Sequence, residues 1–162
     1  MNSLKVVISV IVSCLILSAC FPPVPAPTPT PTAVLTRSEE FVTAAWNAYN
    51  RQQYSDAIGL AQECINKWEK EAVKQQSALT QPPPNGKVTD DEKATIFANW
   101  ALNDVGTAYF IKALSLEKTG KLTEAKDAYQ MAMTFPEARC WDPQGWFWSP
   151  AASARDNLAK IP

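Results

Sequence analysis

The fold is decided by the stretch from Trp100 to Pro136, which reads WALNDVGTAYFIKALSLEKTGKLTEAKDAYQMAMTFP. On both sides of Gly120, apolar residues recur at steps of three and four, the spacing of one face of a helix. Gly120 permits the left-handed conformation that ends many helices, and Pro136 stops the second run. The stretch predicts two antiparallel helices joined by a Gly-Lys turn, the first of them unbroken from about Asp91 to Thr119.

A second pair of helices is predicted nearer the N-terminus, over residues 37–51 and 54–77. Thr36 and Glu39 have the spacing of a capping box, in which a hydroxyl and a carboxylate satisfy free N–H groups at a helix start. Apolar residues follow at helical spacing on both sides of a short break. The stretch between the two pairs, residues 81–91, is rich in proline and is expected to be an exposed loop.

The acidic residues that follow this loop are explained by a helix start. Thr89 and Glu92 form a second capping box, and carboxylates are favoured near the positive end of the helix dipole. Asp90, Asp91 and Glu92 therefore need no metal ion to account for them. We expect neither a bound metal nor a cofactor.

The two helical pairs resemble tetratricopeptide repeats, in which small residues let paired helices approach closely and larger ones fill the space around them. In the second pair the matching residues are Tyr109, Ala113, Leu116, Gly120, Leu122, Ala125, Tyr129, Ala132 and Pro136. In the first pair they are Phe41, Ala45, Tyr54, Ala57 and Cys64. The resemblance implies an all-α domain over residues 36–162, built of two antiparallel helical hairpins. A short capping helix is expected to follow the N-cap residue Ser149.

The resemblance also implies a style of function, because these repeats hold partner proteins along the inner faces of their helices. Carried onto this chain, the groove positions are Val42, Trp46, Tyr49, Asn50, Phe110, Leu114 and Glu117. Several of them are large and apolar, which suits a peptide or a partner helix. The resemblance implies a fold and a binding style but no particular ligand.

The segment after Pro136 contains three of the six tryptophans of the chain, between Trp141 and Trp148. One interpretation is a cap, in which this tail covers the last apolar face of the repeats and closes the groove. The alternative is an aromatic platform for sugar rings or peptide side chains, made of Trp141, Asp142, Gln144, Trp146 and Trp148.

Residues 1–19 have the form of a secretory signal peptide, with one early lysine and then a long apolar run. The run is shorter than the roughly 20 apolar residues that a membrane-spanning helix needs. Residues 17–20, Leu-Ser-Ala-Cys, resemble the lipobox of bacterial lipoproteins. That resemblance implies cleavage before Cys20 and a lipid anchor on it, and the neighbouring Phe21 implies the outer membrane, facing the periplasm. A general signal peptide cut after Ala19 is the alternative.

Residues 20–35 are rich in proline and threonine and are expected to form an extended spacer between lipid and domain. A proline-rich ligand for another domain is the alternative interpretation. Two cysteines, Cys64 and Cys140, then remain in an oxidising compartment. The sequence is compatible with a disulfide between them or with two separate thiols.

Composition narrows the classes of function. The formal net charge is −1 and there is no basic block, which argues against a nucleic-acid partner. The chain has no histidine, so histidine metal sites and histidine-activated nucleophiles are excluded. We expect a protein that is not an enzyme, namely a lipid-anchored interaction or scaffolding module of the bacterial cell envelope. The alternatives are an envelope glycan-binding protein and a purely structural envelope component.

Overall fold

The computed structural model describes residues 35–162. The predicted signal peptide, the lipidation site Cys20 and nearly all of the spacer lie outside the described residues. The described part is mostly helical, with one small two-stranded sheet, and its elements are α1 (Ser38–Asn50), α2 (Tyr54–Ala78), α3 (Asp90–Ala98), α4 (Trp100–Lys118), α5 (Leu122–Met133), β1 (Cys140–Asp142), β2 (Trp146–Trp148) and α6 (Pro150–Leu158). Among these helices, none has the length and apolar character needed to cross a membrane.

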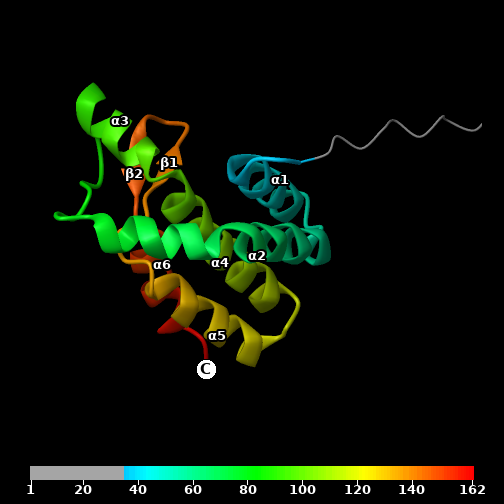
Figure 1. Ribbon diagram of the computed structural model, residues 1–162. Coiled ribbons are helices and arrows are strands. Elements are labelled where there is room, and N and C mark those ends of the chain that lie inside the picture. Colours follow the sequence, from blue (N-terminus) through cyan, green and yellow to red (C-terminus); the bar gives the residue numbers. More distant parts are fainter. Residues whose placement is uncertain (1–34) are drawn as a thin grey trace, which may run out of the picture. The chain divides into compact units, whose positions relative to one another are not determined.

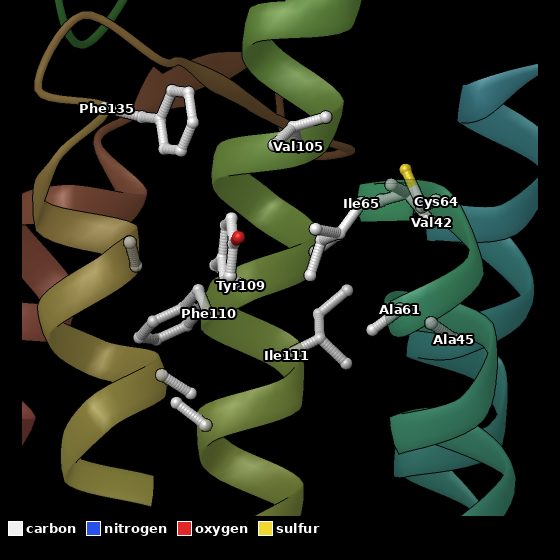
Figure 2. Close-up of a cluster of buried hydrophobic side chains, with 14 of the residues drawn as sticks. Val42, Ala45, Ala61, Cys64, Ile65, Val105, Tyr109, Phe110, Ile111 and Phe135 are labelled. Atoms are coloured by element: carbon white, nitrogen blue, oxygen red, sulfur yellow. The ribbon is translucent and has the colours of Figure 1, made fainter. Parts of the chain in front are cut away.

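Helix α4 is the centre of the core and packs against α1, α2, α5 and α6 (Figure 1). Fully buried alanines on these helices let them approach closely, and they include Ala45, Ala57, Ala61, Ala101, Ala108, Ala113, Ala125 and Ala132. Larger apolar side chains fill the remaining space, and Figure 2 shows Ile65 of α2 and Ile111 of α4 in the layer between these two helices. The all-α fold class predicted from the sequence is confirmed.

The predicted start of α1 is close, but its capping residue is Glu40 and not Glu39. The Oε2 atom of Glu40 accepts hydrogen bonds from the backbone N of Thr36 at 2.7 Å and of Arg37 at 3.1 Å. These bonds hold the pKa of Glu40 down at about 2. Glu39 instead forms an ion pair with Arg37 at 2.8 Å.

Two other predicted helix starts are confirmed. At α3, the carboxylate of Glu92 accepts from the backbone N of Thr89 at 2.8 Å, and the Thr89 hydroxyl accepts from the backbone N of Glu92. At α6, the Ser149 hydroxyl accepts from the backbone N of Ala152 at 3.2 Å. Helix α6 then packs against α5 and α4, and so covers the C-terminal side of the core.

The long helix predicted over 91–119 is wrong, because the chain breaks at Asn99 into α3 and α4. The carbonyl of Ile96 accepts from the backbone N of Asn99 at 3.1 Å and from the side-chain amide of Asn103 at 2.7 Å. The Asn99 amide donates to the Thr95 carbonyl at 3.1 Å. Asparagine side chains thus satisfy carbonyls at the end of α3, and the chain can change direction there.

The tail after α5 forms a β-hairpin, which the periodicity of the sequence does not predict. Strands β1 and β2 pair antiparallel, with Trp141 opposite Phe147. The turn ends at Gly145, whose φ of 101° is rarely adopted by residues with a side chain. The backbone of Phe147 also bonds Gly86 in both directions, at 2.7 and 2.9 Å. The proline-rich loop is exposed over most of its length, as expected, and it is also tied to the hairpin through Gly86.

Two contacts fix the hairpin on the middle of α4. The side-chain oxygen of Asn103 accepts from the backbone N of Arg139 at 2.8 Å. At Gly106 the packing is so close that an added Cβ would lie 2.5 Å from the Cβ of Ala138. A further set of hydrogen bonds joins the same segment to the proline-rich loop. The guanidinium of Arg139 donates at 2.6–3.3 Å to the backbone carbonyls of Pro83, Pro84, Pro136 and Ala138.

Candidate functional site

A cavity of about 910 Å³ lies between α1, α4 and the C-terminal hairpin, with further residues from the end of α3 and from α6. Figure 1 shows α1 and the hairpin on one side of α2, and α5 and α6 on the other. The cavity is therefore built from segments that are far apart in the sequence. Its volume lies near the top of the range of roughly 300–1,000 Å³ that is typical of ligand pockets.

Tryptophan dominates the lining of this cavity. All six tryptophans of the chain lie in the described residues, and five of them line the cavity, namely Trp46, Trp100, Trp141, Trp146 and Trp148. The sixth, Trp68, packs against Phe41 with ring centroids 5.5 Å apart. Phe97, Trp100 and Trp146 remain 46%, 42% and 38% exposed. Large aromatic rings gathered in one place and left in water indicate a binding surface.

Polar side chains share the wall that α1 contributes. Thr43, Asn47 and Asn50 lie on successive turns of α1, line the cavity and are exposed to solvent. Hydroxyl and amide groups both donate and accept hydrogen bonds. The cavity thus combines aromatic faces with groups that can orient a polar ligand.

The predicted groove residues fall into two sets. Four of the seven line the cavity, namely Val42, Trp46, Asn50 and Phe110. The other three lie outside it: Tyr49 packs against Tyr54 with ring centroids 5.6 Å apart, Leu114 packs against the core, and the Glu117 carboxylate accepts from the Tyr129 hydroxyl at 2.8 Å. The groove expected from the resemblance is therefore only partly formed, because three of its positions are used in packing or in a hydrogen bond within the chain.

The predicted aromatic platform lies in the same cavity. Four of its five residues line it, namely Trp141, Asp142, Trp146 and Trp148. Gln144 is at the exposed turn, where its backbone N donates to Asp142 Oδ1 at 2.8 Å. The sequence offered the groove and the platform as separate sites, and the structure brings them together.

The tail covers part of the groove and also forms a wall of the cavity, because Trp148 packs on Phe110 with ring centroids 5.4 Å apart. Successive side chains of a strand point to opposite faces, so Phe147 faces away from Trp146 and Trp148. Phe147 is buried against Phe97 and Trp141, with ring centroids 5.4 and 4.9 Å apart. One face of β2 thus anchors the hairpin, and the other lines the cavity.

A carboxylate with a shifted pKa lies at the floor of the cavity. Burial raises the pKa of Asp104, the hydrogen bond from the Ser38 hydroxyl lowers it, and the nearby Glu39 carboxylate raises it, so that the net change is from 3.8 to about 6. With a pKa of about 6 this carboxyl is mostly ionised at pH 7. The cavity floor therefore carries a negative charge in a partly desolvated position.

Sequence reasoning did not select Trp100, Asp104 or Phe97 as site residues. Asp104 could have been noticed in the sequence, because it is the one charged residue in segment 100–111 of the central helix. Trp100 lies one turn before it, on the same face of α4. The hairpin itself is signalled by the turn-forming sequence Asp142-Pro-Gln-Gly145 between two aromatic runs.

Both cysteines considered for a disulfide are free thiols in the structure. Cys64 is buried between α1 and α2, where burial raises its thiol pKa far above the usual value and its Sγ contacts the Ser38 carbonyl at 3.9 Å. Cys140 lines the cavity, and burial raises its pKa to about 11. Both thiols are therefore protonated at neutral pH and weakly reactive.

In residues 35–162, no group of three or more His, Cys, Asp or Glu side chains is placed to hold a metal ion. Comparisons with known protein families, with curated proteins and with solved structures found no match. The groups that the cavity offers to a ligand are aromatic faces, hydrogen-bonding side chains and carboxylates.

Proposed function

We propose that this chain is a lipid-anchored binding module of the bacterial cell envelope, built from two tetratricopeptide-type hairpins, whose aromatic cavity holds a segment of another envelope protein. The observation that supports this is the convergence of five tryptophans, from α1, α4 and the hairpin, on one cavity that reaches solvent. Such rings supply much of the binding energy at protein interfaces. The anchor on Cys20 would keep the cavity at a membrane surface.

Capture of partner proteins tests this proposal. The full chain, extracted in detergent, is used as bait for solubilised envelopes of the bacterium that produces it. We expect a defined partner to be captured by the wild type and lost with Trp46→Ala and with Trp146→Ala. Trp68→Ala is the matched control, because it removes a tryptophan outside the cavity. Capture of the same partner by all four proteins would contradict the proposal.

The lipid anchor has its own test. We expect the intact protein to carry acyl chains at Cys20, and Cys20→Ser to lose them and to leave the membrane fraction. Mass spectrometry of the mature protein measures both. A mature chain that begins at Cys20 with a free thiol would instead show the general signal peptide cut after Ala19.

A glycan is the second candidate ligand, favoured by the exposed amides of Asn47 and Asn50 beside tryptophan faces. Sugar rings stack on tryptophan and exchange hydrogen bonds with amides. Retention on immobilised envelope glycan tests it. Glycan retention that is lost with Trp146→Ala, while the protein partner is still captured, would favour this candidate.

A further inference from the structure

The charges around the cavity are unbalanced. Three carboxylates line it, those of Glu39, Asp104 and Asp142, and the one cationic residue in the lining is Arg139. Every nitrogen of the Arg139 guanidinium donates to a backbone carbonyl of the chain, and the side chain is only 6% exposed. Arg139 therefore serves mainly to hold the chain together, and its charge is already paired with the Glu137 carboxylate, which lies 3.9 Å from Nη2.

Two of the carboxylates retain capacity for a ligand. Asp142 accepts from the backbone of Gln144 with Oδ1, and Asp104 accepts from the Ser38 hydroxyl with Oδ2. A carboxylate can accept several hydrogen bonds, so each keeps an oxygen for another donor. Glu39 is different, because it lies on the rim in an exposed ion pair with Arg37. The negative charge of the lining that remains available to a ligand is thus that of Asp104 and Asp142.

The aromatic walls are of a kind that binds cations, and the chain itself gives an example. The ammonium of Lys93 lies 3.9 Å from the centroid of the Trp141 ring and 5.8 Å from that of Phe97. Cations over aromatic faces are attracted by the ring quadrupole, most strongly to tryptophan. Within residues 35–162, no lysine or arginine lies over Trp46, Trp100, Trp146 or Trp148 in this way.

We propose that the segment held in the cavity is basic, and that it places a lysine or arginine side chain between the tryptophan faces with its charge toward Asp104 and Asp142. This inference rests on the proposed function, which it deepens by naming the chemistry of the partner. The aromatic rings cover the aliphatic stem of such a side chain, and the carboxylates bind its charged end. A neutral sugar ring would use the rings and amides but would leave both carboxylates without a cation.

The volume of the cavity and its α1 wall favour a peptide over a free amine. A space of about 910 Å³ exceeds what one side chain fills, so residues on either side of the basic one are also accommodated. Thr43 and Asn47 can bond the backbone of an extended segment as it crosses α1.

The test uses four pools of pentapeptides, acetylated and amidated at their ends, with a fixed central lysine, arginine, norleucine or glutamate and mixed uncharged flanks. Equilibrium dialysis against the full chain in detergent at pH 7.5, read by mass spectrometry, measures retention of each pool. We expect the lysine and arginine pools to be retained about tenfold more than the norleucine pool, and the glutamate pool least.

Matched variants then connect the preference to the carboxylates. Asp104→Asn and Asp142→Asn should each bring the ratio of lysine to norleucine retention below about threefold. Asp127→Asn, an exposed acid on α5 outside the cavity, should leave the ratio unchanged. Circular dichroism of each variant confirms that the helices are intact.

Equal retention of the lysine and norleucine pools would overturn this inference, and so would a preference that survives in both Asp104→Asn and Asp142→Asn. The proposed function would survive either result if capture of the envelope partner still depended on Trp46. If partner capture did not depend on Trp46 but the basic pools were still retained through Asp104, the proposed function would fail while the chemistry of the cavity stood.

Discussion

The two faces of α4 carry similar types of residue, but one face packs into the core and the other lines the cavity. The face toward α2 and α5 buries its side chains completely, and Ala108 and Ile111 are 0% exposed. The face toward the cavity leaves Trp100 42% exposed and places Asp104 among aromatic rings. Burial of apolar side chains stabilises the fold, whereas an exposed ring of this size contributes little to it. The difference separates residues that maintain the structure from residues available to a ligand.

Ile111→Ala and Trp100→Ala give the most direct contrast between these faces. We expect Ile111→Ala to lower the free energy of unfolding by about 2–5 kcal/mol, because it opens a cavity in a closed core. Trp100→Ala, although it removes more atoms, should change it by less than about 1 kcal/mol. Guanidinium unfolding followed by circular dichroism measures both. Equal losses would mean that the cavity face is part of the packed core.

Gly106→Ala tests the contact that holds the cavity wall against α4. An added methyl group would meet the Cβ of Ala138 at 2.5 Å, so we expect a loss of about 1–3 kcal/mol in unfolding free energy. Gly59→Ala in α2 is the matched control, since its Cβ would meet no atom within 4 Å. That variant should gain about 0.5–1 kcal/mol from helix propensity. Thermal unfolding of the two variants would show opposite shifts in Tm.

Asp104→Asn tests the charge on the cavity face through its pH dependence. The pKa of Asp104 is about 6 in the folded chain and near 3.8 when unfolded, so the folded state holds more protons between these values. Its contribution to stability therefore falls as pH rises from about 4 to above 6, by on the order of 2 kcal/mol. Asparagine has no such titration. The variant should match the wild type near pH 4 and exceed it at pH 8, and a difference independent of pH would contradict this assignment.

Thr89→Ala should destabilise the chain less than Ile111→Ala or Gly106→Ala and should act locally. It removes the hydroxyl that caps α3, which supports the hairpin through Phe97, and we expect a loss of about 1 kcal/mol. Amide hydrogen exchange should quicken over residues 90–98 and stay unchanged in α5. Uniform acceleration across the chain would show that α3 and the core unfold as one unit.

The packed face could be predicted from the sequence, because its signals are local. Small residues at helical spacing, Gly120 at the turn, and the caps at Thr89 and Ser149 each act within a few residues of the chain. The wrong prediction of the capping residue of α1 also has a local cause. Glu39 and Glu40 are adjacent, and either carboxylate could accept hydrogen bonds from the free N–H groups at the start of the helix. Glu40 does so.

The cavity face could not be predicted in the same way, because distant segments define it. The break at Asn99 depends on Asn103, whose side chain also binds the backbone of Arg139. Apolar periodicity is the same for a ring that is buried and a ring that faces a cavity, so Trp100 could not be told apart from a core residue. Trp46 was selected only through the resemblance to tetratricopeptide repeats. The density of tryptophan in the tail pointed to Trp141, Trp146 and Trp148, which line the cavity, but it did not show that they lie beside α1 or that Gln144 lies outside the cavity.

The hydrogen bonds between Arg139 and the loop that follows α2 have a consequence for the order of folding. Two strands of three residues are too short to be stable alone in water, and this hairpin is held by Pro83 and Gly86, more than fifty residues earlier. Contacts between such distant segments form late, after the local helical pairs. We therefore expect the chain to acquire its helices before its cavity, so that a newly synthesised molecule has a folded core for some time before its cavity is complete.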